Sequence, residues 1–394
     1  MSSGKTEKVA STRDLRLDFF RGLALFSIFI DHIPGNICRY FTIQAIGISD
    51  AAEVFILISG YAAGMVYGGV YQKVSFVAAT ARTLQRAWQL YVAHIFLFML
   101  FMATVAKAAN GFNTSLFAEE FRAADFLKAP DVSIIRALTL QFQPMFMDIL
   151  PLYIVLLGML PLALFGFRHS PWLAFAVIAG LWLAAQIDPR VALKAYPGVD
   201  HTWFFNPFAW QALFLFGAYF GARGVIPKGS PPEGRSWIFW LAAAVAFACF
   251  ALKINWTISD HFQVLTPVLL KQIGPFLSKT DMSPVRFVNV IALAVVVACL
   301  MAPQSKWLKL RAAWPFLVCG RHSLEIFCLG ILLSVIAHYG LTEFLGNAPM
   351  KVVASVAGIA VMVGVAALID WVGSIGAKPA HREPNPKPAS EGRA

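Results

Sequence analysis

Charged residues are scarce in this sequence. Asp, Glu, Lys and Arg make up 13% of the 394 residues, and 58% of the residues are hydrophobic. Soluble domains carry about 25% charged residues. The scarcity of charge therefore excludes an ordinary soluble protein and predicts an all-α, polytopic integral membrane protein whose main partner is the lipid bilayer.

Cysteines are also few, and none of the five belongs to a CxxC pair or another metal-ligand spacing. We expect them to be small buried apolar residues, with no metal site and no bound cofactor. A small-residue cleavage site is missing near the N-terminus, so we expect no removable signal peptide. An internal repeat is missing too, which disfavours an inverted-repeat transporter but leaves that class open.

Long hydrophobic runs are abundant. A spanning helix needs about 20 mostly apolar residues, and about ten transmembrane helices are expected. Their approximate ranges are 16–34, 50–71, 86–106, 148–166, 170–187, 207–222, 237–253, 285–302, 316–339 and 351–373. The domain boundaries follow: a cytoplasmic N-terminal tail at 1–15, a transmembrane domain at 16–376 and a disordered, Pro- and Lys-rich cytoplasmic tail at 377–394.

The cations lie between the apolar runs. The net charge of +11 would suit a nucleic-acid partner, but the basic residues do not gather on one stripe, so we expect no nucleic-acid binding. The short loops on one side are dense in Lys and Arg, which predicts that this side and both termini are cytoplasmic. In the longer loops we expect an amphipathic helix within 107–147.

The first span carries unusual charges. The run LRLDFFRGLALFSIFIDHIPGN at 15–36 contains Asp18, Arg21, Asp31 and His32. Ionisable groups inside a span are costly and usually functional, although an anchor with charged ends is the plainer alternative. On an ideal helix Arg21 and His32 differ by about 20° and lie roughly 16 Å apart along the axis, with Asp18 on the same face.

His32 is the natural candidate for a general base, since an imidazole takes a proton from an alcohol near neutral pH. An interfacial histidine bonded to water is the structural alternative. The second span opens with SDAAEVF, where Asp50 and Glu53 share a face. Asp50 either caps this helix or helps to form the site. Glu53 either completes a capping box or, one turn inside the span, needs a partner.

Two further pairs of ionisable residues are expected on the cytoplasmic side of the bundle. Arg82 and Arg86 are four residues apart at the start of the third span, and they either bind a phosphate-bearing ligand or only set topology. Arg321 and Glu325 are also four apart; we expect them to pair within one helix, and the functional alternative is that they line a cytoplasmic cavity.

Three of these segments resemble a known family. The runs RLDFFRGLALFSIFIDHIPGN, SDAAEVFILISGY and CGRHSLEIF closely resemble OpgC-type proteins, named for succinylation of osmoregulated periplasmic glucans, and look distantly like the wider membrane acyltransferase-3 superfamily. The resemblance is strongest over 13–95 and recurs near 319–330.

The resemblance implies an acyltransferase of the bacterial inner membrane. An acyl-CoA, possibly succinyl-CoA, would donate its acyl group from the cytoplasm to a hydroxyl of an extracytoplasmic glycan. His32 matches the family's base, Asp31 its acidic companion and Arg21 the first-helix arginine. Arg82 and Arg86 match an arginine pair near the donor, with a spacing one residue longer than the usual RxxR.

The sequence thus predicts a membrane O-acyltransferase. The catalytic candidates are His32, Asp31, Glu53 and Asp50. The candidates for donor or substrate binding are Arg21, Asp18, Arg82, Arg86, Arg321 and Glu325. A transporter or flippase for an anionic or glycan substrate explains the buried charges equally well, and a non-catalytic scaffold in glycan export is a third possibility.

Overall fold

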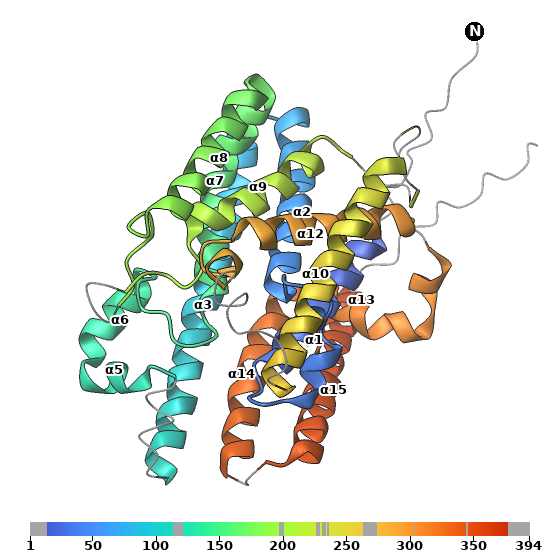
Figure 1. Ribbon diagram of the computed structural model, residues 1–394. Helices are drawn as coiled ribbons and strands as arrows, with labels where there is room; N and C mark the ends of the chain where they lie inside the picture. The colour runs from blue at the N-terminus through green and yellow to red at the C-terminus, as the bar shows by residue number, and fades with distance from the viewer. Residues whose placement is uncertain are drawn as a thin grey trace, which may run out of the picture.

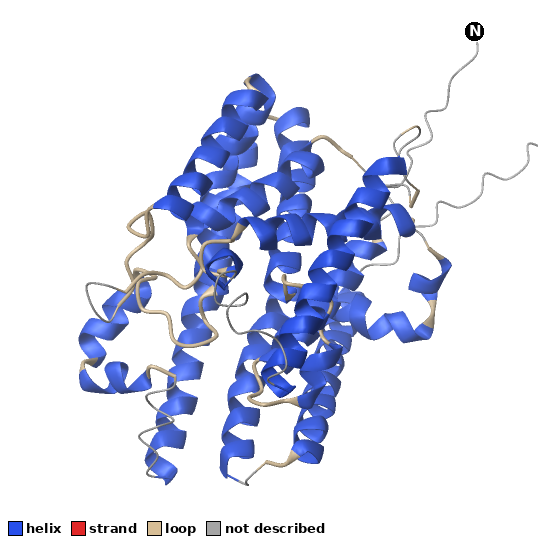
Figure 2. Ribbon diagram, in the orientation of Figure 1, coloured by secondary structure: helices blue, strands red, loops and turns tan. Residues whose placement is uncertain are grey.

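The structure, a computed structural model, describes residues 14–112, 121–196, 201–225, 229–230, 234, 236–262, 274–303, 305–343 and 346–376. Within these ranges every named element is a helix, and extended pairing is limited to two isolated bridges (Figure 2). The all-α prediction is confirmed for them. The predicted C-terminal tail, 377–394, lies outside the described residues, and so does the predicted N-terminal tail apart from residues 14 and 15.

Helices follow one another through the described ranges (Figure 1). In order they are α1 (Leu15–Asp31), η1 (Ile37–Phe41), η2 (Ile43–Ala45), α2 (Ala51–Lys73), α3 (Phe76–Phe112), α5 (Ala123–Lys128), α6 (Pro130–Leu138), α7 (Ile149–His169), α8 (Pro171–Ile187), α9 (Pro207–Ala222), α10 (Ser236–Phe262), η3 (Gly274–Leu277), α12 (Pro284–Leu300), η4 (Lys306–Lys309), η5 (Arg311–Ala313), α13 (Trp314–Arg321), α14 (Ser323–Glu343) and α15 (Ala348–Gly376).

Six of the described helices are long and apolar enough to cross a membrane: α2, α3, α7, α10, α14 and α15. Each of the ten predicted ranges does coincide with helix. However, α1, α8 and α12 have 17 residues and α9 has 16, short of the roughly 20 that span a hydrocarbon core. A multi-pass membrane protein is therefore supported, whereas ten spans are not confirmed.

Local sequence signals explain where several helices begin. Asp50 caps α2, and Glu53 completes a capping box by accepting a hydrogen bond from the Asp50 N–H at 3.0 Å. Proline occupies the first position of α6, α8, α9 and α12, where its missing N–H costs nothing. In the predicted amphipathic region, 107–147, the end of α3 and the short helices α5 and α6 are described, and residues 113–120 lie outside the described residues.

A very close helix contact joins α2 to α9. A Cβ added to Gly64 would lie 2.0 Å from the Ala218 carbonyl oxygen, and one added to Gly221 would lie 1.9 Å from the Tyr61 carbonyl oxygen. The two backbones touch because both helices present small residues at four-residue intervals, the usual device for close packing in membranes. This face of α2 is closed, which leaves its opposite face for other contacts.

The ninth predicted span is not one helix. It divides at His322 (φ −107°, ψ 44°) into α13 and α14. The short α13 packs against α1 backbone to backbone: a Cβ on Gly22 would lie 2.0 Å from the Phe316 carbonyl oxygen, and one on Gly320 would lie 1.8 Å from the Asp18 carbonyl oxygen. Arg321, at the end of α13, is thereby brought to the first half of α1.

The α2–α9 contact yields a stability prediction. Gly64→Ala should lower the free energy of unfolding by about 1–3 kcal/mol, because the added methyl group has to separate two packed backbones. Gly69→Ala is the matched control on the same helix, since nothing lies within 4 Å of the position of its Cβ. Thermal unfolding of the two purified variants in detergent measures the difference. Equal stability would contradict the close packing.

Candidate functional site

His32 lies at the end of α1, which ends before Pro34 and Gly35. Its imidazole stacks on Phe146, with ring centroids 4.1 Å apart and planes inclined by 22°. The Nδ1 atom is buried and has no hydrogen-bond partner. A buried polar atom without a hydrogen-bond partner is uncommon in a folded protein, which marks His32 as a candidate functional group. We call this end of the molecule, where α1 ends and α2 begins, the His32 end.

Asp31 does not hold the imidazole. Its Oδ1 atom accepts hydrogen bonds from Thr42 Oγ1 at 2.8 Å and from Gln44 Nε2 at 2.6 Å. Both donors come from the η1–η2 segment that follows α1. The neighbouring carboxylate in the sequence is thus engaged with this segment, and the expected direct support of His32 by Asp31 is not what the structure shows. The physical reason is the angle of about 100° between successive side chains on a helix.

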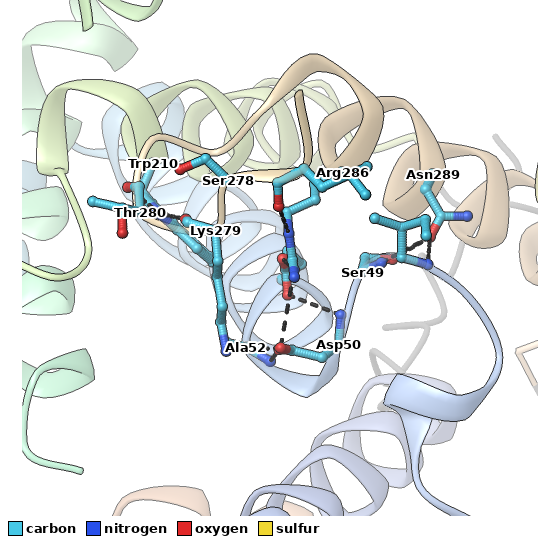
Figure 3. Close-up of polar contacts among 12 residues, drawn as sticks. Ser49, Asp50, Ala52, Trp210, Ser278, Lys279, Thr280, Arg286 and Asn289 are labelled. Carbon is cyan, nitrogen blue, oxygen red and sulfur yellow. Dashed lines mark hydrogen bonds and ion pairs between the residues drawn. The ribbon is translucent and has the colours of Figure 1, made fainter. Parts of the chain in front are cut away.

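Four charged side chains form two ion pairs at the His32 end (Figure 3). Lys279 Nζ lies 2.7 Å from Asp50 Oδ2. Arg286, in the first turn of α12, pairs with Glu53, whose side chain is fully buried, and its guanidinium is also 4.0 Å from Asp50. Capping and pairing are therefore both correct for Glu53: one carboxylate oxygen accepts from the backbone and the other from Arg286.

Hydrogen bonds hold the turn that carries Lys279 next to the start of α2. Trp210 Nε1 donates to the carbonyl oxygens of Lys279 and Thr280 at 3.0 and 3.1 Å, and the Asn206 N–H donates to Thr280 at 3.0 Å. On the other side of the cluster Asn289 Oδ1 accepts from Ser49 N and Oγ at 3.0 and 2.7 Å. Both cations and both carboxylates are thus held by backbone that is itself anchored (Figure 3).

The Asp50–Lys279 pair remains charged in spite of its burial. Burial alone would raise the pKa of Asp50, but the adjacent Lys279 ammonium and Arg286 guanidinium hold it below its ordinary value. Conversely, the Asp50 and Glu53 carboxylates outweigh the burial of Lys279 and raise the pKa of its ammonium. Both groups of the Asp50–Lys279 pair therefore stay charged at neutral pH.

A cavity of about 210 Å³ lies between α1, α2, α3, α7, α13 and α14. Three arginines from three helices line it: Arg21 of α1, Arg86 of α3 and Arg321 of α13. The remaining lining residues are Phe55, Ser59, Ala62, Ala63, Val66, Tyr67, Leu90, Ile149, Leu150, Tyr153, Ser323, Leu324 and Phe327. No carboxylate occurs among these described lining residues, so the wall is cationic.

The cavity runs along α2. Its lining extends on that helix from Phe55, two residues beyond Glu53, to Tyr67. Twelve residues of α-helix correspond to about 18 Å, more than half of the roughly 30 Å hydrocarbon core. Its walls are apolar near Phe55 and Ile149 and cationic at the far end. We call that far end the arginine end.

The remaining predicted residues occupy different surroundings. Arg82 is exposed and is not among the lining residues, in contrast to Arg86. Asp18 is buried on α1.

Arg321 and Glu325 do not pair as predicted, because the helix is interrupted between them. Instead Arg321 lies 3.1 Å from Asp370 of α15, which is also 3.2 Å from His322 Nε2. Glu325 is exposed and lies outside the cavity lining.

Several residues at the His32 end escaped the sequence analysis. Arg286 had a readable signal, since it is an ionisable residue two positions inside an apolar run. Lys279 and Asn289 had none, because their roles depend on contacts with α2 across more than 200 residues of chain. Among the described residues no group of three or more His, Cys, Asp or Glu side chains is arranged to hold a metal ion.

The chain was compared with protein families, curated proteins and solved structures. A family model described as OpgC protein matches residues 13–374. The comparisons find no match for the chain among curated proteins or among solved structures. The matched range contains both the His32 end and the arginine end.

The Arg286–Glu53 pair gives a second prediction. Arg286→Met should destabilise the protein by about 3–5 kcal/mol, because it leaves the fully buried Glu53 side chain without its cation. Adding Glu53→Gln to Arg286→Met should restore much of the loss, since no charge then remains unpaired. Unfolding midpoints of the single and double variants measure this coupling. Additive losses would contradict the pairing.

Proposed function

Because the chain belongs to the OpgC protein family, we propose that it is a membrane O-acyltransferase. The single observation that carries this proposal is the cavity in which Arg21, Arg86 and Arg321 converge and which extends along α2 toward the His32 end. A ligand with an anionic head and a long neutral arm fits such a space. Acyl-CoA has this form, with phosphates at one end and a thioester at the other.

The arginine end would bind the donor. Guanidinium groups bind phosphate oxygens in bidentate fashion. No carboxylate is among the described lining residues, and Arg321 would share its guanidinium between the donor and Asp370, which lies 3.1 Å away. Arg82, exposed one turn before Arg86 on α3, would attract the donor from solution. The thioester arm would lie against the apolar wall of α2, α7 and α14.

The His32 end would carry out the transfer. The imidazole would accept the proton of the acceptor hydroxyl as its oxygen attacks the thioester carbonyl carbon. The carbon–sulfur bond then breaks, and the departing thiolate takes up the proton from the imidazolium. The Asp50–Lys279 and Glu53–Arg286 pairs would fix the start of α2 beside this reaction. Asp31, with Thr42 and Gln44, would order the segment over which the acceptor approaches.

The proposed topology and substrates follow the family. We propose that the arginine end faces the cytoplasm, where acyl-CoA is made, and that both termini lie on that side of the bacterial inner membrane. The His32 end would face the periplasm and receive a hydroxyl group of a glucan. Succinyl is the acyl group that the family name favours. No cofactor is required for this chemistry beyond the acyl-CoA substrate.

His32→Ala tests the enzyme. The purified full-length variant should lose acyl transfer almost completely, because the acceptor hydroxyl then lacks its base, while its unfolding midpoint stays close to that of the wild type. Release of CoA from succinyl-CoA in the presence of a glucan measures the reaction. Retained transfer would remove His32 from the mechanism. Glucan movement across vesicles without any donor would favour the transporter instead.

Arg86→Ala tests the donor site. The loss of one charge-assisted hydrogen bond, worth about 1.5–3 kcal/mol, should raise the KM for acyl-CoA roughly tenfold or more. Arg168→Ala is the control: Arg168 is an exposed cation at the end of α7, stacked over Tyr71 and outside the cavity lining. Arg82→Ala should have a smaller effect than Arg86→Ala. Equal KM values for the wild type and Arg86→Ala would contradict the placement of the donor.

A further inference from the structure

Polar contacts do not set the orientation of the His32 ring. Its Nδ1 atom is buried without a partner, and Asp31 is occupied by Thr42 and Gln44. A catalytic imidazole usually has one nitrogen fixed by a carboxylate or a carbonyl group, which holds the ring in place. In this chain another contact has to perform that task.

The only ring contact described for His32 is the stack on Phe146. The two planes are nearly parallel, inclined by 22° with centroids 4.1 Å apart. Such a stack covers one face of the imidazole, whereas the ring nitrogens lie on its perimeter. A face contact therefore orients the base without itself occupying a ring nitrogen.

Phe146 is held in place by its own surroundings. Its backbone has φ 72°, a region that a bulky residue rarely adopts and that persists only when neighbouring contacts enforce it. Phe121, which is fully buried, meets the Phe146 ring edge to face at 5.7 Å. The next residue, Met147, is also buried, and its N–H donates to the Pro144 carbonyl oxygen at 3.0 Å.

The segment that carries Phe146 is anchored at both ends. On one side, the Tyr196 N–H donates to the Gln141 carbonyl oxygen at 2.9 Å, and the Gln143 side chain donates to Leu140 at 3.1 Å. On the other side Ile149 begins α7. The contacts on both sides of the segment therefore hold the strained backbone of Phe146 in place and keep its ring against the face of His32.

We propose that Phe146 is a positioning residue for His32, one that sets the plane of the imidazole by stacking in place of a carboxylate. This inference rests on the proposed acyl transfer. It predicts that the rate of transfer depends on an aromatic ring at position 146, whereas binding of the donor, which takes place at the arginine end, does not.

A series at position 146 tests the proposal. In the full-length protein, Phe146→Ala and Phe146→Leu should lower kcat at least tenfold and leave the KM for acyl-CoA within about twofold of wild type. Phe146→Tyr should retain most of the wild-type kcat, because it keeps the ring. All three replacements carry a Cβ, so the positive φ is equally strained in each.

Phe142→Leu is the matched control. Phe142 lies in the same segment and is fully buried, but its ring contacts are with Phe98 and Tyr196. It should lower the unfolding midpoint without a selective loss of kcat. A wild-type kcat in Phe146→Ala would overturn the proposal. So would a loss in Phe146→Tyr equal to that in Phe146→Ala, or the same kcat loss in Phe142→Leu.

A second readout does not depend on transfer. The rate at which diethylpyrocarbonate modifies His32, followed by mass spectrometry of the peptide, should rise several-fold in Phe146→Ala and Phe146→Leu and stay near wild type in Phe146→Tyr. If the wild-type protein shows no transfer with any donor, the proposed function fails, but this series still decides whether Phe146 holds the ring. Unchanged modification in Phe146→Ala would overturn the positioning.

Discussion

A charge buried in a membrane-spanning bundle has to be neutralised by a partner or used for a ligand, and the two ends of this molecule meet that constraint differently. At the His32 end Asp50 is neutralised by Lys279, and Glu53 by Arg286. At the arginine end three guanidinium groups line a cavity whose described wall holds no carboxylate, and Arg321 also pairs with Asp370, which lies outside that wall. The balanced end is suited to holding a reaction geometry, and the cationic end to binding an anion.

Helix α2 runs from the His32 end to the arginine end, and its two faces make different contacts. Its first turn carries the ion-paired Asp50 and Glu53, and the face with Gly64 is closed against α9. The opposite face, from Phe55 to Tyr67, forms one wall of the cavity. Close packing on one side therefore fixes the helix that guides a ligand on the other. The break between α13 and α14 adds Arg321 to the same space.

Several residues of the candidate site could be predicted from the sequence, because an ionisable residue stands out within an apolar run. Arg21, Arg86 and His32 were singled out in this way, and the capping box at Asp50 follows from residue spacing alone. The pairing of Arg321 with Glu325 was wrong because the four-residue rule holds only on an unbroken helix. Lys279 and Phe146 were missed, since each acquires its role from contacts distant in the sequence, which no local pattern records.

The central claim is that one ligand reaches from the arginine end to the His32 end. A structure of the full-length protein with a non-hydrolysable thioether analogue of acyl-CoA tests it most directly. We expect the phosphates beside Arg21, Arg86 and Arg321, and the acyl carbonyl group beyond Phe55 within hydrogen-bonding reach of an acceptor hydroxyl at His32. An analogue bound outside the cavity would contradict the proposed transfer. So would an analogue whose arm stays at the arginine end because Phe55 blocks the way toward His32.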